Sequence, residues 1–522
     1  MRVRRATLLT LPFLVPFLCS NPTLAEGNLQ NVQHIIVIMQ ENHSFDDYFG
    51  ALAYAPGSPY HNANGSCLSS DHNCVDGLSC TSDLSGNLTC SNSNLDDDGS
   101  TVLAFHDPSR CVSPDLDHSW LGTHHEANFL NPNSALQNFL SDGFIRVNDV
   151  TEQIDNGTET ATDDQTIGFY NQDDIPFYYD LAAKFAINDR YFASVLGPTF
   201  PNRSYLMAAT SFGHLTTSDE APPNVFSPNA GYQPITGTIF DLLDQNGVSW
   251  ADYFSDIPQG LSFRPFFVNT DPHFLPVQIF LAQAAGVPGF GSLPQVSFVD
   301  PNFGFLGTQF ETDEHPPTDI QRGQAFVSQL VNAVRNGPNW SDSVILITYD
   351  EHGGFYDHAK SPQSKQSGSR TPDGISPGQC ADLSNPPSSE QPGGGAECSS
   401  NLLNPADNSV KDAEDLCPAL ASDPTGPYPA QCASFDQLGV RVPFLAVSPF
   451  SKPGYVSHSI GDHTSILALI ERRFLIVNDV RLHLTLRDEF ADPLEDMFDF
   501  NHSPSLNTAV GQAAPPANDC TP

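Results

Sequence analysis

The sequence predicts an α/β fold with a mostly parallel central sheet flanked by helices. Two apolar runs rich in Val and Ile, at residues 34–40 and 344–349, are typical of buried strands in a sheet that is covered on both faces. Strand-like and helix-like patterns alternate along the chain, an order that produces parallel strands joined by helices. The 522 residues are enough for one large domain or two.

Local signals place the other expected elements. A helix is expected to begin near Asp174, because a capping residue is followed by Pro176 in the first helical turn. The segment from 116 to 215 has the pattern of helices with short links. Further expected elements are a helix at 237–243, strands at 248–253 and 295–301, a helix at 320–336, a strand at 440–449 and a helix at 464–474.

The first 25 residues have the features of a secretory signal peptide. A basic start with Arg2, Arg4 and Arg5 is followed by an apolar stretch at 8–19, and Ala25 lies where small-residue processing is expected. No other segment reaches about 18 uninterrupted apolar residues, so no integral membrane segment is expected in the mature chain. These features predict a secreted or periplasmic protein.

The remaining chain divides into a main domain at 26–480 and a C-terminal tail at 481–522. Two insertions are expected in the main domain. Residues 51–115 form a Cys-rich insertion, and residues 359–434 form a long surface excursion rich in Pro, Gly and Ser. The sequence therefore predicts one domain with long, disulfide-stapled loop insertions.

Ten cysteines remain when Cys19 of the signal segment is set aside. An even number in an exported chain predicts disulfides, whereas zinc would require tight C-x-x-C spacing, which is absent. Five lie towards the front and five towards the back, so at least one bridge must join the two groups if all of them pair. The ten are Cys67, Cys74, Cys80, Cys90, Cys111, Cys380, Cys398, Cys417, Cys432 and Cys520.

Charge limits the classes of partner. Lys and Arg total 21 against 61 Asp and Glu, a formal net charge of -40. Nucleic acids and anionic membranes both attract basic surfaces, so neither is an expected partner. An anionic substrate would need a locally bound cation to offset the field of the protein.

Polar ligand-type residues follow both apolar strands directly. Residues 41–46 come after the first strand, and residues 350–358 come after the second. Because ligands collect at the carboxyl ends of parallel strands, these two distant segments predict one shared cation site. Carboxylate and amide oxygens suit a hard divalent cation such as calcium or magnesium, although other metals remain open.

A third segment adds a hydroxyl group. Thr199 lies in a loop just before an expected helix that has Pro201 in its first turn, where free N–H groups favour an anion. A hydroxyl next to a metal can be deprotonated and become a nucleophile. The alternative is that Thr199 only caps its helix.

Three motifs, in their order and spacing, resemble the bacterial phosphoesterase family of secreted phospholipases C and related acid phosphatases. They are residues 41–46, 197–203 and 350–358. Weaker support comes from residues 296–301, 313–316 and 439–443, and the resemblance covers about residues 30–475. The family is similar in fold to the alkaline phosphatase superfamily.

The resemblance implies a metal held by Glu41, Asn42, Asp350 and Glu351. It also implies that Thr199 becomes phosphorylated, at a position where acid phosphatase relatives carry Ser. A histidine is then expected to protonate the leaving alcohol and activate water, although a lone His is more often structural. The candidates are His118, His315, His352 and His358.

Two residues are candidates for substrate binding, Arg203 and Asn202. Arg203 suits a phosphate oxygen, and a structural salt bridge is an equally open interpretation for it. The chain departs from the family pattern at His43, where relatives commonly carry Arg. It also ends soon after the late helix, as in the shorter members.

The predicted function is that of a phospholipase C acting on phospholipid headgroup diesters. The alternative is a broad acid phosphatase acting on small phosphate esters. A sulfatase-like hydrolase ranks lower, because Thr199 cannot be converted to formylglycine, and the non-enzyme alternative is an extracellular calcium-binding protein.

Overall fold

The computed structural model describes most of the chain between residues 29 and 520. The continuous ranges are 29–63, 65–96, 98–112, 115–132, 139–149, 163–212, 236–263, 271–305, 307–362 and 437–514, with single residues His214, Thr217, Tyr232, Pro234, Asp373, Phe435, Pro516 and Cys520. The predicted signal peptide and nearly all of the predicted excursion at 359–434 lie outside these residues.

Eight strands form the central sheet, in the order β12-β11-β13-β1-β14-β15-β10-β16. Every neighbouring pair is parallel except the two that involve β15, which runs antiparallel to both β14 and β10. The predicted α/β class with a mostly parallel sheet is therefore confirmed. The strands are β1 (His34–Gln40), β10 (Ala186–Asn188), β11 (Trp250–Phe254), β12 (Phe274–Pro276), β13 (Val296–Val299), β14 (Ser343–Tyr349), β15 (Phe444–Val447) and β16 (Tyr455–Ser457).

The two apolar runs at 34–40 and 344–349 are adjacent central strands. β1 and β14 pair in parallel, from His34 opposite Ser343 to Gln40 opposite Tyr349. Six of the seven residues of β1 and all seven of β14 are buried, because the sheet is covered on both faces. The residues that follow the two strands must therefore leave the sheet at the same edge.

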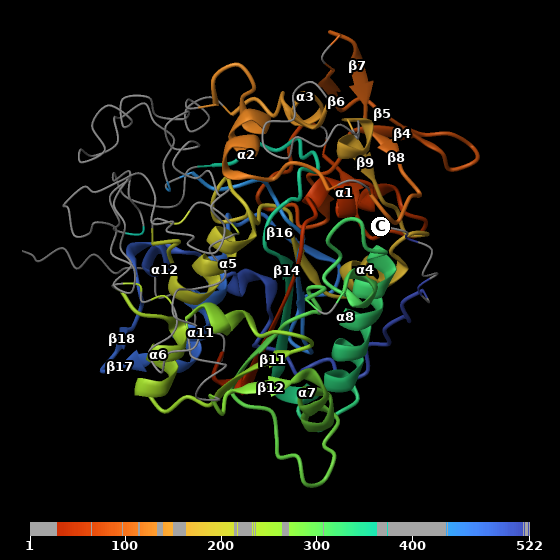
Figure 1. The fold of residues 1–522 in the computed structure, drawn as a ribbon. Helices are drawn as coiled ribbons and strands as arrows, with labels where there is room; N and C mark the ends of the chain where they lie inside the picture. Colours follow the sequence, from red (N-terminus) through yellow and green to blue (C-terminus); the bar gives the residue numbers. More distant parts are fainter. Residues whose placement is uncertain are drawn as a thin grey trace, which may run out of the picture.

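Helices cover the two faces of this sheet in separate groups. Figure 1 shows α4, α7 and α8 on one side of the strands and α5, α6 and α11 on the other. Their bounds are α4 (Pro176–Lys184), α5 (Thr199–Ala208), α6 (Ile239–Gln245), α7 (Val277–Ala284), α8 (Ile320–Arg335) and α11 (His463–Phe474). Within the described part of the chain, no helix is both long and apolar enough to cross a bilayer.

Sequence signals set the ends of these helices. Pro176 is in the first turn of α4, and the side chain of Asp319 accepts a hydrogen bond from the Gln321 amide at the start of α8. The three-residue strands β10, β12 and β16 were not anticipated, because so short a segment shows no periodicity. The remaining helices are α1 (Phe45–Phe49), α2 (Trp120–Ala127), α3 (Phe144–Asn148) and α12 (Leu486–Phe490).

The Cys-rich insertion consists largely of short strand pairs, and β4 to β8 gather at one end of the molecule (Figure 1). Its last strand, β8, pairs with β9 of the main domain. The small strands are β2 (His61–Asn62), β3 (Cys74–Val75), β4 (Cys80–Ser82), β5 (Leu88–Cys90), β6 (Ser93–Leu95), β7 (Thr101–Leu103), β8 (Phe105–His106), β9 (Gly168–Phe169), β17 (Ile476–Val477) and β18 (Val480–Arg481).

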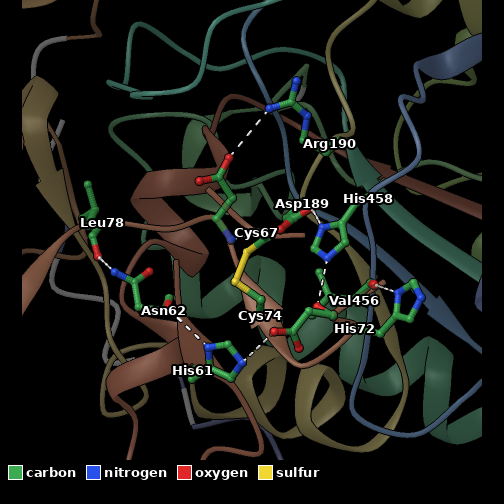
Figure 2. The surroundings of a disulfide bond; sticks show 12 residues. His61, Asn62, Cys67, His72, Cys74, Leu78, Asp189, Arg190, Val456 and His458 are labelled. Atoms are coloured by element: carbon green, nitrogen blue, oxygen red, sulfur yellow. Dashed lines mark hydrogen bonds and ion pairs between the residues drawn. A yellow bond between two sulfur atoms is a disulfide. The ribbon is translucent and has the colours of Figure 1, made fainter. Parts of the chain in front are cut away.

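Disulfides staple this insertion, as expected. Cys67 pairs with Cys74, Cys80 pairs with Cys90, and Cys111 pairs with Cys520, which joins the front and back groups of cysteines. Figure 2 shows the first of these bridges beside the hydrogen-bonded pair of His458 and Asp189. Cys67, Asp189 and His458 lie close together, but the Cys67 sulfur is bonded to Cys74 and cannot bind a metal ion with them. The other four cysteines lie outside the described residues.

Candidate active site

Arg203 joins the ends of the two central strands. Its Nε donates to Asp350 Oδ2 at 2.7 Å, and its Nη2 donates to Glu41 Oε2 at 3.2 Å and to the Gln40 carbonyl at 3.0 Å. The guanidinium is buried, which alone would lower its pKa, but Asp350 and Glu41 together raise it. Arg203 therefore forms the salt bridges that the sequence left open. We use the name Arg203 cluster for Glu41, Asn42, Thr199, Arg203, Asp350 and Glu351.

Thr199 is the first residue of α5, and its hydroxyl points to the same carboxylates. Thr199 Oγ1 donates to Glu41 Oε1 at 3.1 Å. The N-cap position of α5 is Pro198, and no side chain makes a capping hydrogen bond there. The alternative that Thr199 only caps its helix is therefore wrong, and its hydroxyl is placed with the predicted metal ligands.

Asn202 shapes the loop that presents Thr199. Its Oδ1 accepts from the Val195 amide at 3.0 Å, and its Nδ2 donates to the carbonyls of Gly197 at 2.7 Å and Pro198 at 3.1 Å. The side chain is fully buried. The side-chain hydrogen bonds of Asn202 are thus made to its own loop. This position suits a residue that holds Thr199 in place better than one that contacts a substrate directly.

The predicted metal ligands leave acceptor oxygens free. Asn42 Oδ1 and Glu351 Oε1 are buried and have no hydrogen-bond partner among the residues that the structure describes. Asn42 also has a φ of +81°, which is costly for a residue with a side chain and is typical of functional sites. A Cβ at Gly353 would lie 2.6 Å from Asn42 Oδ1, so only glycine leaves that oxygen room. Buried, unpaired oxygens of this kind fit a hard divalent cation.

His118 and His315 lie side by side next to Asp115. Their ring centroids are 5.7 Å apart, and Asp115 lies 3.6 Å from His315 Nε2 and 3.9 Å from His118 Nδ1. Burial alone would lower both pKa values. Glu351 and Asp115 nevertheless raise the pKa of His118 to about 9, and Asp115 and Glu41 raise that of His315 to about 10. These carboxylates thus favour the protonated form of both rings, which is the form that a proton donor to a leaving group requires.

His352 is buried behind Glu351. Its Nε2 lies 2.6 Å from Glu126 Oε2, and its Nδ1 lies 3.4 Å from Glu351 Oε2. Burial lowers its pKa, but Glu126 and Glu351 more than compensate and raise it to about 10. His352 therefore orients Glu351 and belongs to the support of the cluster.

His358 belongs to a different group of charges. Its Nδ1 lies 2.6 Å from Asp46 Oδ2, and Arg441 donates to both Asp46, at 3.0 Å, and Asp357, at 2.9 Å. Asp76 of the Cys-rich insertion lies 3.4 Å from His358 Nε2. We call these five residues the Arg441 cluster. The structure does not bring His358 to Thr199, so a catalytic role for it has no geometric support.

A cavity of about 260 Å³ opens against the Arg203 cluster. Its charged or ionisable lining residues are Glu41, Arg203, Glu311, Asp313 and His315. Much of the rest is an apolar wall made of Phe200, Met207, Ile257, Leu261, Phe263 and Phe303. The cavity brings Glu41, Arg203 and His315 to one opening with space for an organic group, and Thr199 contacts it through its hydrogen bond to Glu41.

Sequence reasoning missed the carboxylates that support this site. Asp115 also accepts from Asn42 Nδ2 at 3.4 Å, so it links the metal ligands to the histidine pair. Glu314 is buried and accepts from the hydroxyls of Tyr48 at 2.5 Å, Tyr178 at 2.6 Å and Tyr349, which fixes the turn before His315. Both lie next to histidines already singled out, and that proximity was the signal that could have found them.

Comparison with known proteins finds similarity to phosphoesterases over most of the chain. The model of the Phosphoesterase family matches residues 32–477. Non-specific phospholipase C1 of Arabidopsis thaliana is 28% identical over 486 residues, which cover 91% of this chain and 72% of that protein. Phospholipase C B of Mycobacterium tuberculosis is 28% identical over 475 residues, covering 86% of this chain and 74% of that protein. Non-hemolytic phospholipase C of Burkholderia pseudomallei is 27% identical, covering 86% and 56%.

Proposed function

This chain belongs to the Phosphoesterase family and is a phosphoric ester hydrolase, and we propose that it is a secreted, metal-dependent enzyme of the phospholipase C type. The substrate would be a phospholipid whose headgroup diester is cut through a phosphothreonine intermediate on Thr199. The observation that supports this most directly is the hydrogen bond of 3.1 Å from Thr199 Oγ1 to Glu41 Oε1, inside a buried cluster of carboxylates.

Glu41, Asn42, Asp350 and Glu351 would hold a divalent cation, with calcium or magnesium as the expected ions. Such a cation would supply positive charge to the phosphoryl oxygens and lower the pKa of a neighbouring hydroxyl. The oxygens without partners on Asn42 and Glu351 support this assignment, because an uncompensated buried oxygen costs folding free energy.

The residues of the chain divide the chemistry between them. Thr199 Oγ attacks phosphorus, the bond from phosphorus to the alcohol oxygen breaks, and the threonine proton passes to Glu41, which already accepts its hydrogen bond. His118 or His315 donates a proton to the departing alcohol. The same histidine then takes a proton from water, whose oxygen attacks phosphorus and releases the phosphorylated headgroup, while Glu41 returns its proton to the departing Thr199 oxygen.

The apolar wall of the cavity supports an organic group on the phosphate. Phe200, Phe263 and Phe303 would pack against the diester's carbon chains or headgroup. The three relatives named above are all phospholipases C. Secretion is supported by the three disulfides among the described residues, since such bridges persist in oxidising compartments.

The test compares two substrates with the purified mature chain. We expect release of diacylglycerol from phosphatidylcholine that exceeds phosphate release from a simple monoester, and we expect Thr199→Ala to remove it. Strong monoester turnover without diester turnover would instead establish the acid phosphatase alternative. Hydrolysis that survives in Thr199→Ala would show that Thr199 is not the nucleophile.

A further inference from the structure

One loop connects the cavity to the outside of the molecule. Residues 302–312, which we call the rim loop, follow β13 at the same edge of the sheet as the Arg203 cluster. Phe303 of this loop lines the cavity, and the Arg203 guanidinium carbon lies 5.0 Å from the centre of its ring. The rim loop is therefore part of the wall of the candidate active site.

Hydrogen bonds hold the described part of this loop in shape. At its base the Asn302 amide donates to Thr312 Oγ1 at 2.9 Å, and the Thr312 amide returns to the Asn302 carbonyl at 2.9 Å. Asp256 accepts from the amides of Phe303 at 3.2 Å and Phe305 at 3.0 Å. The loop thus has a closed base and a fixed connection to the neighbouring cavity loop that carries Ile257.

Two large aromatic side chains of the same loop face solvent. Phe305 is 67% exposed and Phe310 is 56% exposed. Single exposed apolar residues are common on protein surfaces, but two aromatic rings on one short, well-anchored loop at the mouth of a cavity are not. Arg322 of α8 donates to the Gln309 carbonyl, which holds the loop beside Phe310 in place.

We propose that the rim loop docks this protein on a zwitterionic lipid surface by inserting Phe305 and Phe310 among the lipid headgroups. The inference rests on the proposed function, because a phospholipid diester lies at such a surface. The net charge of -40 would repel an anionic bilayer, so the attraction must come from apolar contact. Insertion of these two rings would bring the mouth of the cavity to the headgroups, so the enzyme would not have to pull a whole lipid out of the bilayer.

The test compares three chains: the native sequence, the double variant Phe305→Ser with Phe310→Ser, and the control Phe290→Ser. Phe290 is a fair control because it is 46% exposed and lies between α7 and β13, at the amino end of a strand whose carboxyl end leads into the rim loop. Neither Phe305 nor Phe310 lines the cavity. Binding is measured by sedimentation with phosphatidylcholine vesicles, and turnover is measured on those vesicles and on water-soluble p-nitrophenyl phosphorylcholine.

We expect the double variant to bind vesicles at least about tenfold more weakly, since two exposed phenyl rings are lost. Vesicle turnover should fall in parallel, while turnover of the soluble diester stays within about twofold and Phe290→Ser behaves as the native chain. Unchanged vesicle binding, or an equal loss on both substrates, would overturn the inference. A variant that loses self-association instead of vesicle binding would show that the loop contacts a second copy, and would also overturn it.

These outcomes are separable from failure of the proposed function. A native chain that hydrolyses neither diester would contradict phospholipase C activity, and vesicle sedimentation would still decide the role of the rim loop. A native chain that hydrolyses the soluble diester but never sediments with vesicles would overturn the inference and leave the hydrolase standing.

Discussion

The Arg203 and Arg441 clusters are built alike and differ in how completely their polar atoms are paired. Each places one buried arginine between two aspartate or glutamate side chains near the carboxyl ends of β1 and β14. In the Arg441 cluster, Arg441 also donates to the carbonyls of Asp76 at 2.7 Å and Asp189 at 2.9 Å. No buried side-chain atom of that cluster lacks a partner within the described structure.

The Arg203 cluster is incomplete by comparison. Asn42 Oδ1, Glu351 Oε1 and Arg203 Nη1 are all buried without a described partner, and a cavity opens beside them. A complete network stabilises a fold, whereas unpaired buried groups that lie beside a cavity are compatible with a bound ligand. Similar residue sets around the ends of β1 and β14 thus form a fully paired network in one case and an incompletely paired one beside a cavity in the other.

The largest expected effect comes from the hydroxyl that only the Arg203 cluster possesses. Thr199→Ala should lower kcat by about a thousandfold or more, because it removes the proposed nucleophile. Thr199→Ser keeps a hydroxyl at the same position and is the matched control, with substantial activity expected. Steady-state kinetics on the preferred ester measures both. Loss of activity in both variants alike would point to a packing defect in place of a lost nucleophile.

The next effect concerns stability, and it should separate the two arginines. Arg441→Met should lower the free energy of unfolding by about 3–5 kcal/mol, since Asp357 would be left buried without a charged partner and Asp46 would keep only His358. Arg203→Met should cost clearly less when calcium or magnesium is present, because a bound cation would compensate Glu41 and Asp350. Urea denaturation of both variants measures this. If Arg203→Met lost the same free energy of unfolding with and without the cation, a cation bound by Glu41 and Asp350 would be contradicted.

Removal of divalent cations should act on one cluster alone. At a cation concentration about a hundredfold above Kd, binding should stabilise the folded chain by about 2.7 kcal/mol relative to excess EDTA. Glu351→Gln should remove most of that difference. His358→Asn, in the Arg441 cluster, should retain it. A denaturation midpoint that does not respond to EDTA in the native chain would contradict the cation site.

The smallest expected effect is a pH dependence that belongs to the Arg441 cluster. Burial alone would lower the pKa of His358, but Asp46 and Asp76 raise it from 6.5 to about 10. The folded state thus favours the protonated ring, so its contribution is complete below pH 6.5 and is lost as the pH rises through about 10. The native chain should lose on the order of 2 kcal/mol more than His358→Asn between neutral pH and pH 10. Parallel urea titrations at both pH values measure the difference, and equal losses would contradict it.

Much of the fold and the centre of the site could be predicted from the chain alone. The apolar runs at 34–40 and 344–349 could only be buried strands, and their parallel pairing brings Glu41 and Asp350 to one edge. Thr199 could be proposed because a hydroxyl directly preceded an expected helix. The supporting residues Asp115 and Glu314 lie near candidate histidines in the sequence, but their contacts could not be predicted, since their partners Asn42 and Tyr178 lie far away in the sequence.

The histidines show most clearly where sequence reasoning stopped. His352 and His358 share one motif with Asp350, and all three were grouped at one site. In the structure the chain turns at Gly353 and Gly354, with φ values of +65° and +75°, and carries His358 to Asp46 and Arg441. Only glycine adopts such angles at little cost, so the motif is a turn that serves two clusters.

The sequence by itself determined the central strands of the sheet, the edge where its ligands gather and the types of ligand atom, because these follow from local apolar pattern and from strand direction. Only the tertiary structure decided which arginine meets which carboxylates, which polar atoms stay unpaired and which aromatic rings face solvent. Those outcomes depend on how α5, the rim loop and residues 353–358 pack against a sheet that brings distant segments together, and no local pattern encodes that packing.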